Sequence, residues 1–273
     1  MQLGISSLAW DPADDAYVAE QARLHGLEFV DLAPTKYFGA EWSPTAAQLD
    51  SLRRFWTDHG MPVRALQSLL FGTDGLSVFG DVASRAALVN HLERVASIGA
   101  ALGAKNLVFG SPRNRDRGML NDSQAEAIAV DFFCRAGDVV AAHGLVLCLE
   151  PNPARYGCNF MTDVSTTARV VRAIGHAAVA LNFDTGAVHI NCEAPDAALA
   201  AAQGLIGHVH LSEPDLVPLG EYGAAHDAMA AAFRRARIRA ASIEVLPPNG
   251  RELRNWLPAC LVFAAHYYGS PNT

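Results

Sequence analysis

The chain is poor in long apolar runs and in basic residues. No uninterrupted apolar stretch approaches the roughly 18 residues that a membrane span requires, and the opening residues, MQLGISSLAW, carry no cationic stretch of the kind that begins a secretory signal. With 21 Lys and Arg against 28 Asp and Glu, the formal net charge is −7, whereas proteins that track phosphates usually carry a basic excess. We therefore expect a cytoplasmic protein with neither a membrane nor a nucleic acid as partner; the sequence leaves a homo-oligomer open.

Paired cysteines and phosphate-binding glycine turns are also missing. The five cysteines form no CxxC pair, and one of them, Cys148, lies inside the apolar run LVLCLE. We expect reduced thiols that pack in the core rather than a disulfide framework. No GxGxxG or GxxxxGK[ST] turn follows the first apolar run, which argues against a dinucleotide-binding or P-loop fold.

The chain does contain one pattern, an apolar run followed by a stretch of helical periodicity, that recurs along its length and gives eight predicted strands. Short runs of apolar and β-branched residues alternate with stretches of helical periodicity, such as 46–60, 85–104 and 123–144, several of which end in glycine. This alternation predicts parallel strands buried on both faces. A doubly wound sheet is one solution, but eight units fit a (β/α)8 TIM barrel better, which we expect to form a single domain over residues 1–273. The predicted strands cover 3–10, 27–34, 62–68, 105–111, 144–151, 178–185, 206–213 and 241–247.

Four polar residues stand near the ends of the last four predicted strands. Because the site of a TIM barrel lies at the carboxyl ends of its strands, these side chains are expected at one depth around the mouth. A buried carboxylate costs several kcal/mol unless it is paired or bound to a cation, and no Lys or Arg shares these strand ends. A bound divalent metal would offset the free-energy cost of burying these carboxylates. Mn²⁺ is favoured, with Mg²⁺ or Co²⁺ as alternatives. The four predicted ligands are Glu150, Asp184, His210 and Glu244.

The segment GHVHLSE places two histidines on one face of a strand, because residues two apart point to the same side. His210 is nearer the mouth and is predicted to bind the metal. His208 is expected one layer deeper, packing behind the ligand, and Glu213 is expected in the loop above, holding a ligand or a substrate hydroxyl. A lone histidine that points into a barrel is usually a core residue with its hydrogen bonds satisfied. The prediction that His210 binds a metal therefore depends on all four strand ends together.

Several further residues are candidates for substrate contacts. Arg113 opens the loop SPRNRDRG after the fourth strand and could bind phosphate or carboxylate, while we expect Arg115 and Arg117 to be solvated charges near Asp116. Trp10 could stack on a sugar face or simply pack. The remaining candidates, Gln67 and Asn152, could donate to hydroxyl groups.

Taken together, these motifs resemble the xylose isomerase-like TIM barrels, which include sugar-phosphate isomerases and epimerases, ketose 3-epimerases, hydroxypyruvate isomerases and inosose dehydratases. The resemblance covers nearly the whole chain. It rests on GISSLAW, VFGSPRNRDRG, LEPNP, NFDTG, GHVHLSE and IEVLP. It implies that Glu150, Asp184, His210 and Glu244 hold the metal and that the two glutamates act as the acid/base pair. The implied activity is proton transfer next to a sugar carbonyl through an enediolate.

The chain departs from the ketose 3-epimerase pattern at three positions. Ala187 stands where those enzymes usually have a histidine, with His189 as the nearest candidate. Tyr156 and Leu216 stand where a substrate-binding glutamate and arginine are usual. We therefore expect a metal-dependent isomerase or epimerase of a sugar or sugar phosphate, with the usual free-ketose specificity in doubt.

Three other functions stay open on the same barrel. A dehydratase of a cyclic polyol would share the metal and the enolate chemistry. An abasic-site endonuclease would need further metals and a basic face, which Asp31, Gln67, Ala187 and the net charge do not favour. A non-catalytic carbohydrate-binding barrel would not need the opposed Glu150 and Glu244.

Overall fold

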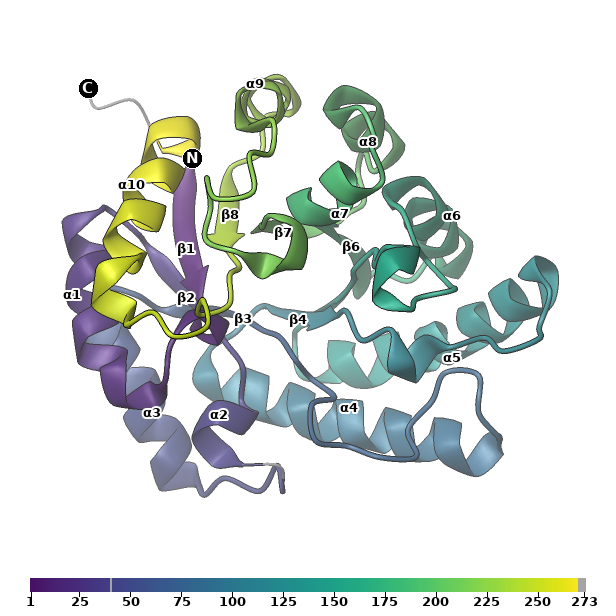
Figure 1. Cartoon of the computed structure of the whole chain (residues 1–273). Helices are drawn as coiled ribbons and strands as arrows, with labels where there is room; N and C mark the ends of the chain where they lie inside the picture. Colours follow the sequence, from purple (N-terminus) through teal and green to yellow (C-terminus); the bar gives the residue numbers. More distant parts are fainter. Residues whose placement is uncertain (40, 270–273) are drawn as a thin grey trace.

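Eight parallel strands close into one barrel in chain order (Figure 1). This computed structural model describes residues 1–39 and 41–269. Each strand pairs with its sequence neighbours, and the last pairs with the first, so the predicted (β/α)8 TIM barrel is confirmed. The strands are β1 (Gln2–Ser6), β2 (Phe29–Leu32), β3 (Val63–Leu66), β4 (Asn106–Phe109), β5 (Val146–Leu149), β6 (Val179–Asp184), β7 (Ile206–Leu211) and β8 (Ala240–Ile243).

Helices follow the strands and surround the barrel (Figure 1). The three stretches predicted as helices correspond to α3, α4 and α5. The helices are α1 (Asp15–Leu24), α2 (Thr35–Phe38), α3 (Ala46–Asp58), α4 (Val82–Leu102), α5 (Asp122–Ala142), α6 (Val164–Ile174), α7 (Thr185–Ile190), α8 (Pro195–Ala201), α9 (His226–Ala236) and α10 (Leu257–Tyr268). Short 3-10 turns at Arg113–Arg115, Ala154–Tyr156 and Pro214–Leu216 lie in the loops after β4, β5 and β7.

Local sequence signals set the helix ends. Thr45 and Asn121 each form a capping box with a glutamine three residues later, which satisfies amide groups at the starts of α3 and α5. Helix α4 ends at Leu102 and is capped by Gly103, whose φ of 86° lies in the left-handed region that glycine adopts without strain. The helices then pack on the strands through aromatic pairs such as Phe109 with Phe133, whose ring centroids are 5.4 Å apart.

The strands end earlier than the apolar runs that predicted them, and this positions the polar residues. Strand β5 ends at Leu149 and β8 at Ile243, so Glu150 and Glu244 are the first residues beyond their strands. Between β6 and β7 the register shifts after Leu181, and the shifted register places Asp184 beside His210. The carboxyl ends of β5 to β8 therefore bring all four residues to one edge of the barrel.

Among the described residues, no helix combines the length and the apolar character needed to cross a membrane.

Candidate metal and catalytic site

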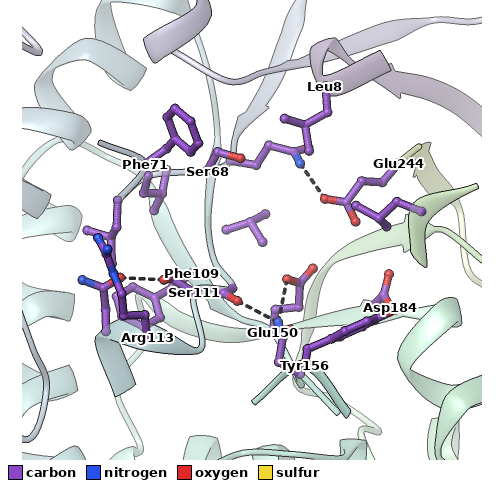
Figure 2. A pocket seen from close by; sticks show the side chains of 18 of the residues that line it. Leu8, Ser68, Phe71, Phe109, Ser111, Arg113, Glu150, Tyr156, Asp184 and Glu244 are labelled. Carbon is purple, nitrogen blue, oxygen red and sulfur yellow. Dashed lines mark hydrogen bonds between the residues drawn. The ribbon is translucent and has the colours of Figure 1, made fainter. Parts of the chain in front are cut away.

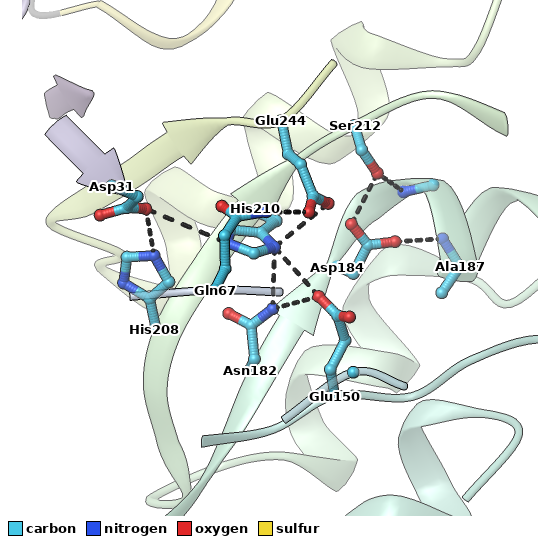
Figure 3. Close-up of polar contacts among 12 residues, drawn as sticks. Asp31, Gln67, Glu150, Asn182, Asp184, Ala187, His208, His210, Ser212 and Glu244 are labelled. Atoms are coloured by element: carbon cyan, nitrogen blue, oxygen red, sulfur yellow. Dashed lines mark hydrogen bonds and ion pairs between the residues drawn. The ribbon is translucent and has the colours of Figure 1, made fainter. Parts of the chain in front are cut away.

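Four side chains converge at the carboxyl end of the barrel (Figure 3). Each of Glu150, Asp184, His210 and Glu244 offers a ligand atom within 4.8 Å of the others. All four are buried, with exposures between 0% and 9%. The structure therefore brings together the four residues that the strand-end spacing singled out.

Hydrogen bonds fix the orientation of the two glutamates. His210 Nδ1 lies 3.0 Å from Glu150 Oε1 and 3.2 Å from Glu244 Oε2, so one imidazole nitrogen faces both carboxylates. Asn182 Nδ2 donates to Glu150 Oε1 at 2.6 Å, and Gln67 Nε2 donates to Glu244 Oε1 at 2.6 Å. Each carboxylate is thereby held by one side-chain amide in addition to His210 (Figure 3).

Asp184 is held separately. Its Oδ2 accepts a hydrogen bond from Ser212 Oγ, and its Oδ1 accepts one from the Ala187 amide, both at 2.6 Å. It thus caps the start of α7 while its carboxylate remains within reach of the other three ligands.

The electrostatics of the cluster favour a bound cation. Burial, together with the charges of Glu150 and Glu244, raises the pKa of Asp184 to about 7. Burial alone would lower the pKa of His210, but the charge of Glu244 and hydrogen bonds to both glutamates outweigh it and raise that pKa well above its usual value. No Lys or Arg forms an ion pair with these three carboxylates within residues 1–39 and 41–269. Three carboxylates and one imidazole nitrogen are a donor set that suits a divalent metal of intermediate hardness.

Gly110, the first residue after β4, makes room for one of the ligands. A Cβ at this position would lie 2.0 Å from Glu150 Oε2. The carbonyl oxygen of Gly110 accepts a hydrogen bond from Asn152 Nδ2 at 2.7 Å, and the same amide lies 3.5 Å from Glu150 Oε2. Backbone and carboxylate thus approach each other here because no side chain intervenes.

A second polar group lies beneath the ligands and was only partly predicted. His208 packs edge-on against His210 with ring centroids 5.1 Å apart, which agrees with its expected place behind the ligand. Its Nε2 lies 2.8 Å from Asp31 Oδ2, which is also 4.0 Å from His210 Nε2. Although burial opposes it, the charges of His208 and His210 lower the pKa of Asp31. The sequence signal for Asp31 was a carboxylate inside the apolar run LEFVDLAP.

A cavity of about 780 Å³ opens above the cluster (Figure 2). Glu150, Asp184 and Glu244 contribute to its wall, whereas His210 is fully buried beneath. Three of the predicted substrate contacts also line it, namely Gln67, Arg113 and Asn152.

Three other predicted contacts, Trp10, His189 and Glu213, are not among the residues that line this cavity. Trp10 is 2% exposed because the chain turns after β1 and directs the indole toward α1, where Nε1 donates to Asp15 Oδ1 at 2.6 Å. His189 lies on α7 against the ring of Tyr222. Glu213 is buried and accepts hydrogen bonds from the amides of Gly220 and Tyr222 and pairs with His226, so it anchors a loop.

The arginine loop also differs from expectation. Arg113 lines the cavity, but its guanidinium donates to the Thr73 carbonyl and lies 3.6 Å from Asp74. Arg115, which we expected in solvent, is fully buried and donates to the carbonyl oxygen of Glu150 at 2.6 Å. Arg117 pairs with Asp122 rather than with Asp116. The buried cation in this loop therefore supports the backbone of a predicted metal ligand.

Comparisons with known proteins agree with this architecture. The family model described as xylose isomerase-like TIM barrel matches residues 19–260, and no curated protein matches the chain. The chain is similar to a D-psicose 3-epimerase crystallised in the presence of D-fructose (18% identity, TM-score 0.81, covering 99% of this chain and 100% of that chain). It is also similar to 3-keto-D-glucoside 4-epimerase YcjR from E. coli (16% identity, TM-score 0.78, covering 97% of this chain and 99% of that chain). A third similar structure is the IolI protein with a bound zinc atom (16% identity, TM-score 0.75, covering 99% of this chain and 100% of that chain). At these identities the likeness to solved structures shows the fold.

Proposed function

The chain belongs to the xylose isomerase-like TIM barrel family, and we propose that it is a divalent-metal-dependent isomerase or epimerase of a sugar. The observation that carries this proposal is the pair Glu150 and Glu244. Their carboxylates project from β5 and β8 into one cavity and face the same His210 nitrogen at 3.0 and 3.2 Å. A substrate carbon between them would have one base on each side, as proton removal and return require.

The metal would be held by Glu150, Asp184, His210 and Glu244. When bound, it would act as a Lewis acid that polarises the substrate carbonyl and stabilises the negative charge formed on proton removal. Mn²⁺ suits the donor set best in our proposal, with Mg²⁺ or Co²⁺ as alternatives.

The chain's own residues would supply orientation and proton transfer. Gln67 holds one oxygen of Glu244, and Asn182 holds one oxygen of Glu150. One glutamate would take the proton from carbon, and the other would return a proton. Return to the same carbon from the opposite face gives an epimer, whereas return to the neighbouring carbon gives an isomer.

The test is exchange of carbon-bound hydrogen in D₂O, followed by NMR over a panel of ketoses, aldoses and sugar phosphates with added Mn²⁺. Exchange reports proton removal whatever the product. Glu244→Gln and Glu150→Gln keep the side-chain volume and one ligand oxygen but remove the base, so each should lower exchange by about 10²-fold or more. Glu28→Gln makes the same chemical change at an exposed position before β2 and serves as the matched control.

Two results would count against the proposal. A glutamine variant that holds metal and keeps full exchange would make that glutamate a ligand only and would refute the two-base scheme. A wild-type protein that binds metal but exchanges no sugar proton would refute the proposed reaction, and loss of water from a cyclic polyol would then be assayed.

A further inference from the structure

We propose that the substrate of this site is an uncharged sugar that carries an apolar aryl or alkyl group, rather than a free monosaccharide or a sugar phosphate. This inference rests on the proposed function and adds the class of substrate.

The size of the cavity is the first observation. It measures about 780 Å³, within the range of roughly 300 to 1,000 Å³ of pockets that take drug-sized ligands. Figure 2 shows Glu150, Asp184 and Glu244 on one side of the cavity, with Phe71 and Arg113 on the other. A sugar ring held at the carboxylates would leave the side near Phe71 unfilled.

Exposed apolar side chains line the cavity, with Phe71 across from the carboxylates and Tyr156 beside Asp184 (Figure 2). Phe71 is 70% exposed, Leu246 is 42% exposed and Tyr156 is 38% exposed, and all three line the cavity together with Leu8 and Leu216. Exposed apolar surface gathered in a concave site is typical of ligand binding, because covering it removes apolar area from water. An apolar group joined to the sugar would cover this wall.

The loops hold two of these side chains in place. The Leu246 amide donates to the Leu216 carbonyl at 2.7 Å, which joins the loops after β8 and β7. Asp215 and Leu216 have φ values of 59° and 54°, in the left-handed region that costs a non-glycine residue free energy and recurs at functional sites. Asp215 is fixed by an ion pair with Arg155 and by its amide, which donates to Tyr156 Oη at 2.7 Å.

Tyr156 and Leu216 both line the cavity and add a phenol ring and a branched aliphatic side chain to its wall.

The charges on the wall oppose a phosphate. Among the described residues, 1–39 and 41–269, Arg113 is the only basic one that lines the cavity, and its guanidinium donates to the Thr73 carbonyl and lies 3.6 Å from Asp74. A phosphate dianion would meet a net negative wall even with a divalent cation bound. The acidic residues of the lining are Asp74, Glu150, Asp184, Asp215 and Glu244, and of these Asp215 is paired with Arg155.

The experiment compares matched substrates in the D₂O exchange assay with the Mn²⁺-loaded protein. Each D-ketohexose is offered free, as its 1-O-benzyl and 6-O-benzyl ethers, and as its 1- and 6-phosphates. We expect at least a tenfold higher kcat/KM for one benzyl ether than for the parent ketose, with the phosphates slowest. Equal or faster exchange of the free ketose or a phosphate would overturn the inference and leave the proposed function standing. No exchange with any compound would overturn both.

Variants locate the effect. Phe71→Ala and Leu246→Ala should each lower the ratio of kcat/KM for the benzyl ether to kcat/KM for the free ketose by several-fold. Leu24→Ala removes an exposed leucine from α1, outside the cavity, and should not change this ratio. If the wall is instead covered by a second copy of the chain, sedimentation will show a dimer that Phe71→Ala and Leu246→Ala dissociate, and the inference fails.

Discussion

Replacing Gly110 with alanine should disturb the metal site while leaving the fold nearly intact. The added Cβ would lie 2.0 Å from Glu150 Oε2, about 1 Å closer than the 3.0 Å that real Cβ atoms respect. The atom in the way is the end of a flexible side chain, and Gly110 has no left-handed φ, so the carboxylate rather than the backbone should move. A displacement of about 1 Å at a reacting group can lower the rate by about 10²-fold.

The assay for Gly110→Ala is exchange in D₂O at saturating Mn²⁺, with metal affinity measured by calorimetry and unfolding followed without metal. We expect exchange to fall by about 10²-fold and metal binding to weaken, while the melting temperature of the metal-free protein stays close to wild type. Gly99→Ala in α4 is the control, since its Cβ would crowd Leu145 Cδ2 at 2.9 Å, away from the ligands. Full exchange and full metal affinity in Gly110→Ala would refute the placement of Glu150.

The remaining predictions concern charge in and beneath the cluster. Because the folded-state pKa of Asp184 is raised to about 7, the stability that its neutral form contributes is complete below the ordinary value of 3.8 and is lost as pH rises through about 7. Between pH 4 and about 7, the melting temperature of the chelator-treated wild type should therefore fall by more than that of Asp184→Asn. Added Mn²⁺ should remove this difference. Melting temperatures that fall in parallel with pH for the two proteins would contradict the raised pKa of Asp184. Asp31→Asn weakens the contact with His208 and the charge near His210. It should lower metal affinity by about 10- to 100-fold, as loss of a group behind a ligand does, and calorimetry showing wild-type affinity would argue against this role.

The fold could be predicted from the sequence because its signal is repeated in every unit. Strands buried on both faces must be short and apolar, and helices must connect them, so the alternation predicted a parallel sheet and the eight repeats favoured a closed barrel. The strand ends were less well predicted. Periodicity does not show where pairing stops, and the runs ending at 151 and 247 extend past Leu149 and Ile243, where β5 and β8 end.

The candidate site was predictable where a strand fixes the direction of the side chain and not where a loop does. Glu150 and His210 lie at or next to the ends of β5 and β7, two βα units apart, so their common position at strand ends predicted their convergence. Trp10 and Glu213 lie in segments whose turns direct the side chains to Asp15 and to a loop. The burial of Arg115 likewise depends on a carbonyl group 35 residues away in the chain, which no local pattern shows.

The most direct test of the central claim is the anomalous scattering of Mn²⁺ in crystals of the protein. One peak should lie within about 2.0 to 2.6 Å of oxygens of Glu150, Asp184 and Glu244 and of Nδ1 of His210. The side chains already converge within 4.8 Å of one another, so binding needs only small rotations. A peak elsewhere, or no peak at saturating Mn²⁺, would contradict the assignment of these four strand ends as the metal site.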